Sequence, residues 1–191
     1  MVLDHHFPPD IRVEKEARSL IRYGHEVHLL CVSEKNETEM FGNIYVHRIF
    51  FDRSSIKKRI LYATRTRFFN YFYINKWCNE LIKLHQKENF SVFHAHDLTT
   101  MPFTLLAGKR TKVPVIFDMH EDYVAMLFSR LGGENVLRKF KYFLLNILPL
   151  EIWERISLAL STKIIVVVEE DKMDLAVFIK PLIKSLSSRY L

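Results

Sequence analysis

Short apolar segments alternate with longer segments of helical periodicity along the chain. The apolar segments predict strands over residues 1–4, 26–33, 43–51, 90–95, 113–118 and 163–168. Apolar residues three and four apart predict helices over 12–23, 56–88, 98–109, 122–131 and 134–160. Strands that alternate with helices pair in parallel, because each connection crosses one face of the sheet. The pattern therefore predicts an α/β fold: a Rossmann-like, doubly wound parallel sheet with helices on both faces.

Proline and glycine mark several of the expected boundaries. Pro8 and Pro9 keep residues 5–10 as a loop, because proline lacks the backbone N–H that regular structure uses. Gly24 suits the residue that follows the first helix. Pro149 is expected to kink or break the last long helical stretch.

The composition is that of a soluble globular domain. The 191 residues are 49% hydrophobic and 26% charged, and no apolar run approaches the roughly 20 residues that span a bilayer. The first residues lack the charged segment that opens a secretory signal. Cys31 and Cys78 lie far apart, and Cys31 falls in an apolar strand. We expect reduced cysteines and a cytoplasmic protein, with peripheral contact to the inner face of the membrane as an addition.

Positive charge is concentrated in one segment. Residues 52–90 hold nine basic and three acidic residues, an excess that equals the net charge of +6 of the whole chain. Aromatic residues are frequent within 65–77. One interpretation is an amphipathic helix with its aromatic face in the core. The alternatives are contact with an anionic membrane surface through residues 53–77, and, less favoured, contact with nucleic acid.

Two strands end in histidine and acidic residues. Residues 93–97 read FHAHD, and residues 115–121 read VIFDMHE. Side chains alternate along a strand, so His94 and His96 share one face. We expect His94 to pack within the layers, and His96 and Asp97 to project at the end of the strand. Open α/β sheets bind ligands at the carboxyl ends of their strands, so both clusters are expected to face one cleft.

The second cluster places Asp118, His120 and Asp122 on one face if the strand extends that far. A histidine beside carboxylates is oriented by them and can donate to an oxygen of a substrate. His120 is therefore a candidate site residue. The alternative is that Asp118 and Glu121 only cap the helix that follows.

The same histidines allow a metal interpretation, which we do not favour. His94 and His96 could share an ion if Asp97, His120 or Asp122 supplied the remaining ligands. No spacing fixes that geometry, and no metal is expected.

The loop before the first helix is a second candidate region. Asp10 and Arg12 lie where doubly wound folds approach phosphates, because the amides at a helix N-terminus attract anions. Arg12 is expected to contact a phosphate or a sugar hydroxyl, or else to pair with a nearby glutamate.

Four segments together resemble family-4 glycosyltransferases of the GT-B fold. They cover the opening of the chain, the two polar strand ends and a helix with a valine-rich strand, at residues 7–29, 94–97, 115–121 and 151–170. The resemblance implies the N-terminal, acceptor-side domain of a retaining transferase that moves a sugar from a nucleotide-sugar donor to a saccharide or lipid-linked acceptor. It implies no cofactor besides that donor.

The resemblance also implies roles for individual residues. His120 takes the position of the family's cleft histidine near the donor sugar and diphosphate, and Asp97 joins it as a catalytic residue. Substrate-binding roles fall to the side chains of Asp10, Arg12, His96 and Glu121. The loop at Asp10 lacks the paired glycines of many members, so close backbone contact with the diphosphate is not implied.

The end of the chain departs from the family. Residues 1–172 are expected to form the N-terminal domain, and residues 173–191 an atypical helical tail. The donor-binding domain is expected to be absent, as in a truncated product or one chain of a split enzyme with a separate partner chain. Little or no activity is then expected of this chain alone. A non-enzymatic basic module that uses residues 53–77 is the alternative function.

Overall fold

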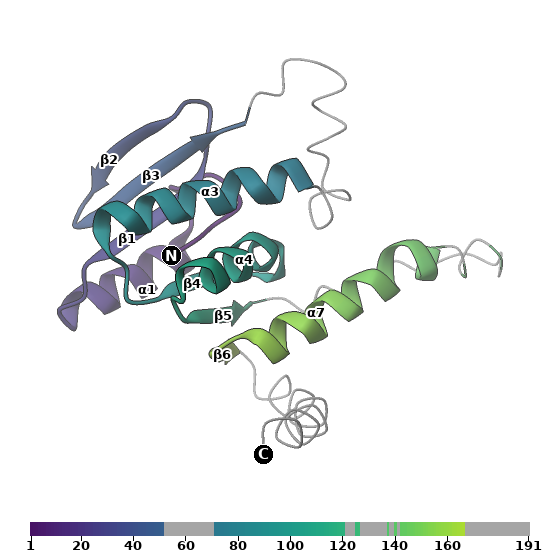
Figure 1. Ribbon diagram of the computed structural model, residues 1–191. Coiled ribbons are helices and arrows are strands. Elements are labelled where there is room, and N and C mark those ends of the chain that lie inside the picture. Colours follow the sequence, from purple (N-terminus) through teal and green to yellow (C-terminus); the bar gives the residue numbers. More distant parts are fainter. Residues whose placement is uncertain (52–70, 121–124, 127–136, 138–139, 141, 167–191) are drawn as a thin grey trace.

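The computed structural model of the protein describes residues 1–51, 71–120, 125–126, 137, 140 and 142–166. Strands and helices alternate through these residues (Figure 1). The strands are β1 (Val27–Ser33), β2 (Glu37–Phe41), β3 (Ile44–Phe50), β4 (Phe93–His96), β5 (Val115–Met119) and β6 (Lys163–Val166). The helices are α1 (Ile11–Arg22), α3 (Tyr71–Glu88), α4 (Met101–Thr111) and α7 (Leu148–Leu160), with a 3₁₀ turn at Leu98–Thr100 and a π turn at Phe143–Ile147.

The strands pair in two groups that Val2 joins. One group has the order β2-β3-β1 and the other β4-β5-β6. Val2 forms parallel bridges with Leu30 of β1 and Ala95 of β4, so the first residues lie between the two groups. All pairings are parallel except β2 with β3. The predicted α/β fold with a parallel sheet and helices is confirmed.

The antiparallel strand β2 was not predicted from the sequence. Only one face of a sheet-edge strand needs apolar residues, and all five residues of β2 are partly or fully exposed. The sequence did carry a signal: Gly42 and Asn43 form a two-residue turn between β2 and β3, with Gly42 at φ 58°. A Gly-Asn pair between strands is typical of a β-hairpin, because such turns need positive φ.

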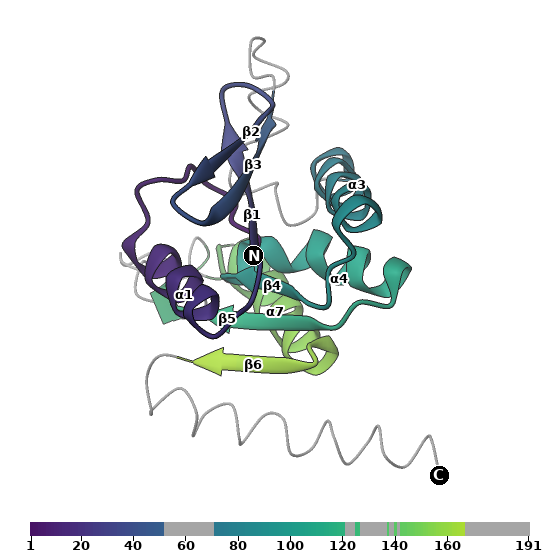
Figure 2. The same ribbon diagram turned by 90° about the vertical axis from the view of Figure 1, so that its left-hand side faces the viewer.

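Alternate side chains of each strand enter different apolar clusters. In β1, Leu30 and Val32 pack with α3 and α4, whereas Leu29 and Cys31 pack with α1. The helices α3 and α4 thus cover one face of the sheet and α1 covers the other (Figure 2). Both faces of the central strands β1 and β4 are buried, as the doubly wound fold requires.

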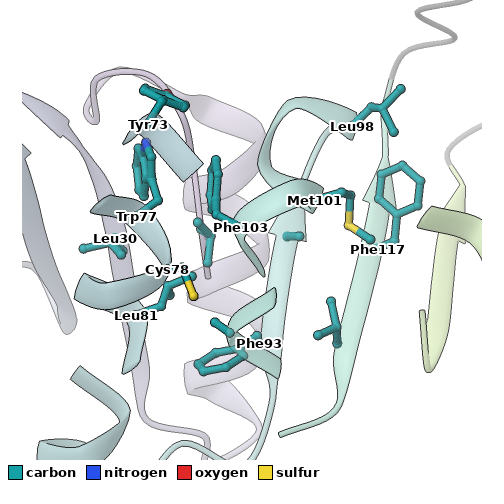
Figure 3. Close-up of a cluster of buried hydrophobic side chains, with 14 of the residues drawn as sticks. Leu30, Tyr73, Trp77, Cys78, Leu81, Phe93, Leu98, Met101, Phe103 and Phe117 are labelled. Atoms are coloured by element: carbon teal, nitrogen blue, oxygen red, sulfur yellow. The ribbon is translucent and has the colours of Figure 1, made fainter. Parts of the chain in front are cut away.

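Aromatic rings dominate the cluster beneath α3 and α4 (Figure 3). The Trp77 ring is fully buried and stacks on Phe103, with ring centroids 4.7 Å apart and planes 7° apart. Tyr73, one turn earlier, is buried as well. The expectation that the aromatic face of this helix lies in the core is therefore confirmed for these two residues.

Two other aromatic residues of α3 point to solvent. Tyr71 is 71% exposed and Phe72 is 65% exposed. The remainder of the basic, aromatic segment, residues 52–70, lies outside the described residues.

Pro149 marks a change of helix type. The π turn leads directly into α7, and Pro149 lies in the first turn of α7. Because the chain is already helical before α7, the missing N–H of Pro149 leaves a carbonyl of the preceding turn without its usual backbone donor. Of the helices expected over 122–131 and 134–160, residues 122–124, 127–131, 134–136, 138–139 and 141 lie outside the described residues, as does the whole tail 173–191.

Both cysteines are buried and free, as expected. Burial raises the pKa of the Cys31 thiol to about 11, so it behaves as a small apolar side chain. Among the described residues, no helix combines the length and apolar character that a bilayer crossing needs.

Candidate functional site

The two histidine-bearing strand ends lie side by side on one face of the sheet. The register pairs His96 with Asp118 across β4 and β5. Phe93 and Phe117, which alternate with these residues, enter the cluster beneath α4. His94, His96 and Asp118 consequently face α1, as the alternation predicted.

Asp118 is the centre of this arrangement. Its carboxylate is fully buried, and Oδ2 lies 3.3 Å from Nε2 of His94 in a hydrogen bond. The same oxygen lies 3.1 Å from Nδ1 of His96 and 2.8 Å from Nε2 of His120. Burial works to raise the pKa of Asp118, but the three imidazoles outweigh it and hold that pKa far below its usual range. Asp118 is therefore an ionised carboxylate that positions three histidines.

The pKa values of His120 and His96 change in opposite directions. Contact with Asp118 raises the pKa of His120 despite partial burial. Burial lowers the pKa of His96 to about 4, with a further contribution from His94. His120 thus gains a proton readily and can donate to an anionic oxygen, whereas His96 is neutral.

His96 differs from the expectation that it projects at the strand end. It is only 1% exposed, because α1 covers this face of β4. Its ring stacks against His94 at 4.5 Å and lies parallel to that of His120 at 5.8 Å. A direct contact between His96 and substrate remains a prediction, but the described surroundings favour a role through neighbouring groups.

Glu16 of α1 completes the group, and sequence reasoning did not single it out. Its Oε2 lies 3.8 Å from Nδ1 of His96, and its Oε1 lies 3.7 Å from Nε2 of His120. Burial, followed by the charge of Asp118, raises the pKa of Glu16 to about 7. A signal was present, because Glu16 falls on the apolar stripe of α1, three residues after Val13 and four before Leu20.

Asp97 adopts a backbone conformation that is unusual for a residue with a side chain. Its φ is 65° and its ψ is 159°, a region occupied almost only by glycine, at a cost of about 1–3 kcal/mol. The Asp97 N–H donates to the carbonyl of Asp118 at 2.9 Å. The Thr100 hydroxyl donates to the carbonyl of Asp97 at 3.0 Å. A strained backbone conformation that is maintained at the end of a strand is typical of functional sites, which agrees with a functional role for Asp97.

Asp10 and Arg12 lie at the N-terminus of α1. Asp10 Oδ1 accepts hydrogen bonds from the backbone N–H groups of Arg12 and Val13, so Asp10 caps the helix. Its Oδ2 contacts His5 at 3.0 Å, and the Arg12 guanidinium lies 3.6 Å from it. Although burial opposes the change, these partners lower the pKa of Asp10. The Arg12 side chain is half-exposed and remains available to a ligand.

Two candidate residues from the sequence have no described position. Glu121 and Asp122 lie outside the described residues. The contact of His120 with Asp118 nevertheless shows that the same-face arrangement of that cluster extends one residue beyond β5.

Comparisons with known proteins give a consistent result. The sequence matches the family described as Glycosyltransferase Family 4 over residues 11–180. The structure is similar to sucrose-phosphate synthase from Thermosynechococcus elongatus, with a TM-score of 0.65 and 11% sequence identity. That match covers 92% of this chain and 43% of the synthase, and at this identity it establishes the fold alone. No curated protein matches the sequence.

Proposed function

Because the chain belongs to glycosyltransferase family 4 and has a GT-B-type fold, we propose that it supplies the acceptor side of a sugar-transfer site. The proposed reaction moves a sugar from a nucleotide-sugar donor to a saccharide or lipid-linked acceptor, with retention of the anomeric configuration. The observation that carries the proposal is the convergence of His96, Asp118 and His120 at the carboxyl ends of β4 and β5. That edge is where open parallel sheets bind their ligands.

His120 is the group proposed to contact the donor. Asp118 raises its pKa, which favours a ring that donates a hydrogen bond to the diphosphate or to a sugar hydroxyl. The buried Asp118 carboxylate also fixes the ring, which lowers the entropy lost when the donor binds. Asp97 and Arg12 are proposed to face the sugar or acceptor, Asp97 from the end of β4 and Arg12 from α1.

The nucleotide is proposed to bind elsewhere. The chain spans less than half the length of the synthase that it resembles, 43% by the structural match. We therefore propose that a second domain or a separate chain holds the nucleotide, and that this chain alone transfers sugar slowly or not at all.

This function can be tested by adding a donor-binding domain to the chain. The purified chain is mixed with uridine- and guanosine-diphosphate sugars and with saccharide or lipid-linked acceptors. Each mixture is assayed alone and with a separately expressed donor-binding domain of a family-4 enzyme. We expect transfer only when both halves are present, and a product whose anomeric configuration, measured by NMR, matches that of the donor. Rapid transfer by the chain alone would contradict the proposal that the nucleotide binds to another domain or chain. A product of inverted anomeric configuration would contradict a retaining mechanism.

A membrane-facing surface is a second proposal, in line with a lipid-linked acceptor. Its specific observation is the pair of exposed aromatic side chains, Tyr71 and Phe72, at the start of α3. They lie within residues 52–90, the segment in which the positive charge is concentrated. Aromatic and basic residues together favour the interface of anionic bilayers.

Replacing both Tyr71 and Phe72 by serine is expected to weaken binding to vesicles that contain anionic lipid by about tenfold or more, since partial burial of two aromatic rings contributes over 1.4 kcal/mol. Co-sedimentation with phosphatidylserine vesicles measures the effect. The matched control is Tyr23→Ser, because Tyr23 is 83% exposed but lies at the end of α1. Equal losses in both variants, or none in either, would exclude this surface.

A further inference from the structure

Four side chains around Asp118 each offer a ligand atom to a common point. Glu16, His94, His96 and Asp118 have one imidazole nitrogen or carboxylate oxygen apiece, and these atoms all lie within 4.8 Å of one another. The atoms come from three elements, α1, β4 and β5, so tertiary packing holds them.

Three of the distances between these atoms lie near those of a tetrahedral metal centre. Bonds of about 2.0–2.1 Å to zinc separate neighbouring ligand atoms by about 3.3 Å. Asp118 Oδ2 lies 3.3 Å from His94 Nε2 and 3.1 Å from His96 Nδ1. Glu16 Oε2 lies 3.8 Å from His96 Nδ1.

The orientation of His96 points to an ion rather than to a hydrogen-bond network. His96 is 1% exposed, and within the described part of the chain neither of its ring nitrogens has a hydrogen-bond partner. Nδ1 is close to Asp118 but is not aligned with it as a donor. Buried polar atoms without partners are rare because they cost free energy. Two atoms that are close yet misaligned are expected when both point at a third position between them.

We propose that Glu16, His94, His96 and Asp118 bind a divalent transition-metal ion of the zinc class. Two imidazoles and two carboxylates suit zinc, whereas magnesium and calcium select oxygen ligands. The sequence suggested Asp97, His120 or Asp122 as the ligands beyond the histidine pair. The structure supplies Asp118 and Glu16 instead.

The ion has a structural consequence for the neighbouring His120. Its Nε2 lies 2.8 Å from Asp118 Oδ2, so a metal bound to Asp118 fixes the carboxylate that orients His120. This inference rests on geometry and not on the proposed transfer reaction.

A second cluster in the molecule provides a contrast. Glu26, His28 and Glu88 also bring ligand atoms together. Here His28 is already satisfied, with Nδ1 2.9 Å from His47 Nε2 and Nε2 2.8 Å from Glu26. Glu88 contacts Lys87 at 2.7 Å. This cluster is a hydrogen-bonded network, and it is expected to bind no ion.

The test measures metal binding by the full, untagged chain without any sugar nucleotide. Metal is removed with a chelator, and Zn²⁺ and Co²⁺ are then titrated by calorimetry and by the visible absorption of tetrahedral cobalt. We expect one ion per chain, and affinity reduced by about 100-fold or more in His96→Asn. Glu16→Gln is expected to weaken binding by at least about tenfold, and it decides the outcome if His96→Asn fails to fold, because Glu16 lies on a partly exposed helix face.

His28→Gln is the matched control, since it removes a buried histidine from the second cluster. It is expected to leave the affinity unchanged. Absence of binding by the unaltered chain, or equal affinity in Glu16→Gln, would overturn the site. A loss of metal affinity in His28→Gln as large as in Glu16→Gln would also overturn it, because the affinity would then depend on the integrity of the fold and not on these four ligands. Each of these results leaves the transfer assay unaffected, so the two proposals can fail separately.

Discussion

Replacement of His120 by alanine is expected to lower the rate of sugar transfer by about 10²–10³, the usual cost of removing one preorganised hydrogen-bond donor from a reacting group. The physical reason is that Asp118, 2.8 Å away, raises the pKa of the imidazole and orients the ring. Alanine removes the proton donor. The rate is measured as release of the nucleoside diphosphate, with the chain and a donor-binding half present together.

Two further variants separate chemistry from folding. His120→Gln keeps a neutral donor and is expected to recover part of the rate, whereas a purely structural role predicts no recovery. His25→Ala removes an exposed histidine at the end of α1 and is expected to leave the rate unchanged. A His120→Ala protein that folds normally and transfers sugar at the original rate would falsify the assignment.

Replacement of Trp77 by alanine is expected to reduce the free energy of unfolding by about 3–5 kcal/mol, because a fully buried aromatic side chain leaves both lost apolar burial and a cavity. Trp77 of α3 links three parts of the core. It stacks on Phe103 of α4 (Figure 3), and it packs against Phe51, which follows β3. A loss of this size corresponds to a fall in Tm of roughly 6–20 °C for a chain of this length.

Urea denaturation followed by circular dichroism measures this loss as a shift in the midpoint at unchanged slope. Tyr71→Ala is the matched control on the same helix. It removes an exposed aromatic ring and is expected to change stability by less than about 0.5 kcal/mol. A similar loss of unfolding free energy in the two variants would show that burial of the Trp77 ring contributes no more to stability than an exposed ring does.

The two replacements are expected to act independently. Trp77 lies in the cluster beneath α3 and α4, whereas His120 contacts Asp118 and Glu16 on the face that α1 covers. Sites on opposite faces that share no partner usually contribute additively. A Trp77→Phe protein, with the ring partly retained, is therefore expected to transfer sugar normally at a temperature where it is folded.

Much of the fold could be predicted because each buried strand is a local apolar signal. The strand at Val27–Ser33 is mostly apolar and is buried through Val32, as a strand covered on both faces requires. β6 is also apolar after Lys163, but it lies at the edge of its group, and Ile165 is exposed. β2 escaped prediction for the opposite reason. It lies at an edge, and its polar residues pair only with β3, so no strong apolar pattern marks it.

The sequence by itself determined the alternation of strands and helices, and it determined which strand ends carry histidine and acidic residues. Both follow from side-chain period, which is a local property. It could also place His94 with His96, and Asp118 with His120, on one face of each strand.

Only the tertiary structure decided how these faces meet. The register that sets His96 opposite Asp118 and the packing of α1 that brings Glu16 to them join residues far apart in the chain. The surroundings then set the pKa values of the two histidines. Burial lowers the pKa of His96, whereas the contact with Asp118 raises the pKa of His120. Two histidines of one type thus acquire different chemistry, because desolvation and neighbouring charge depend on the surroundings that folding creates.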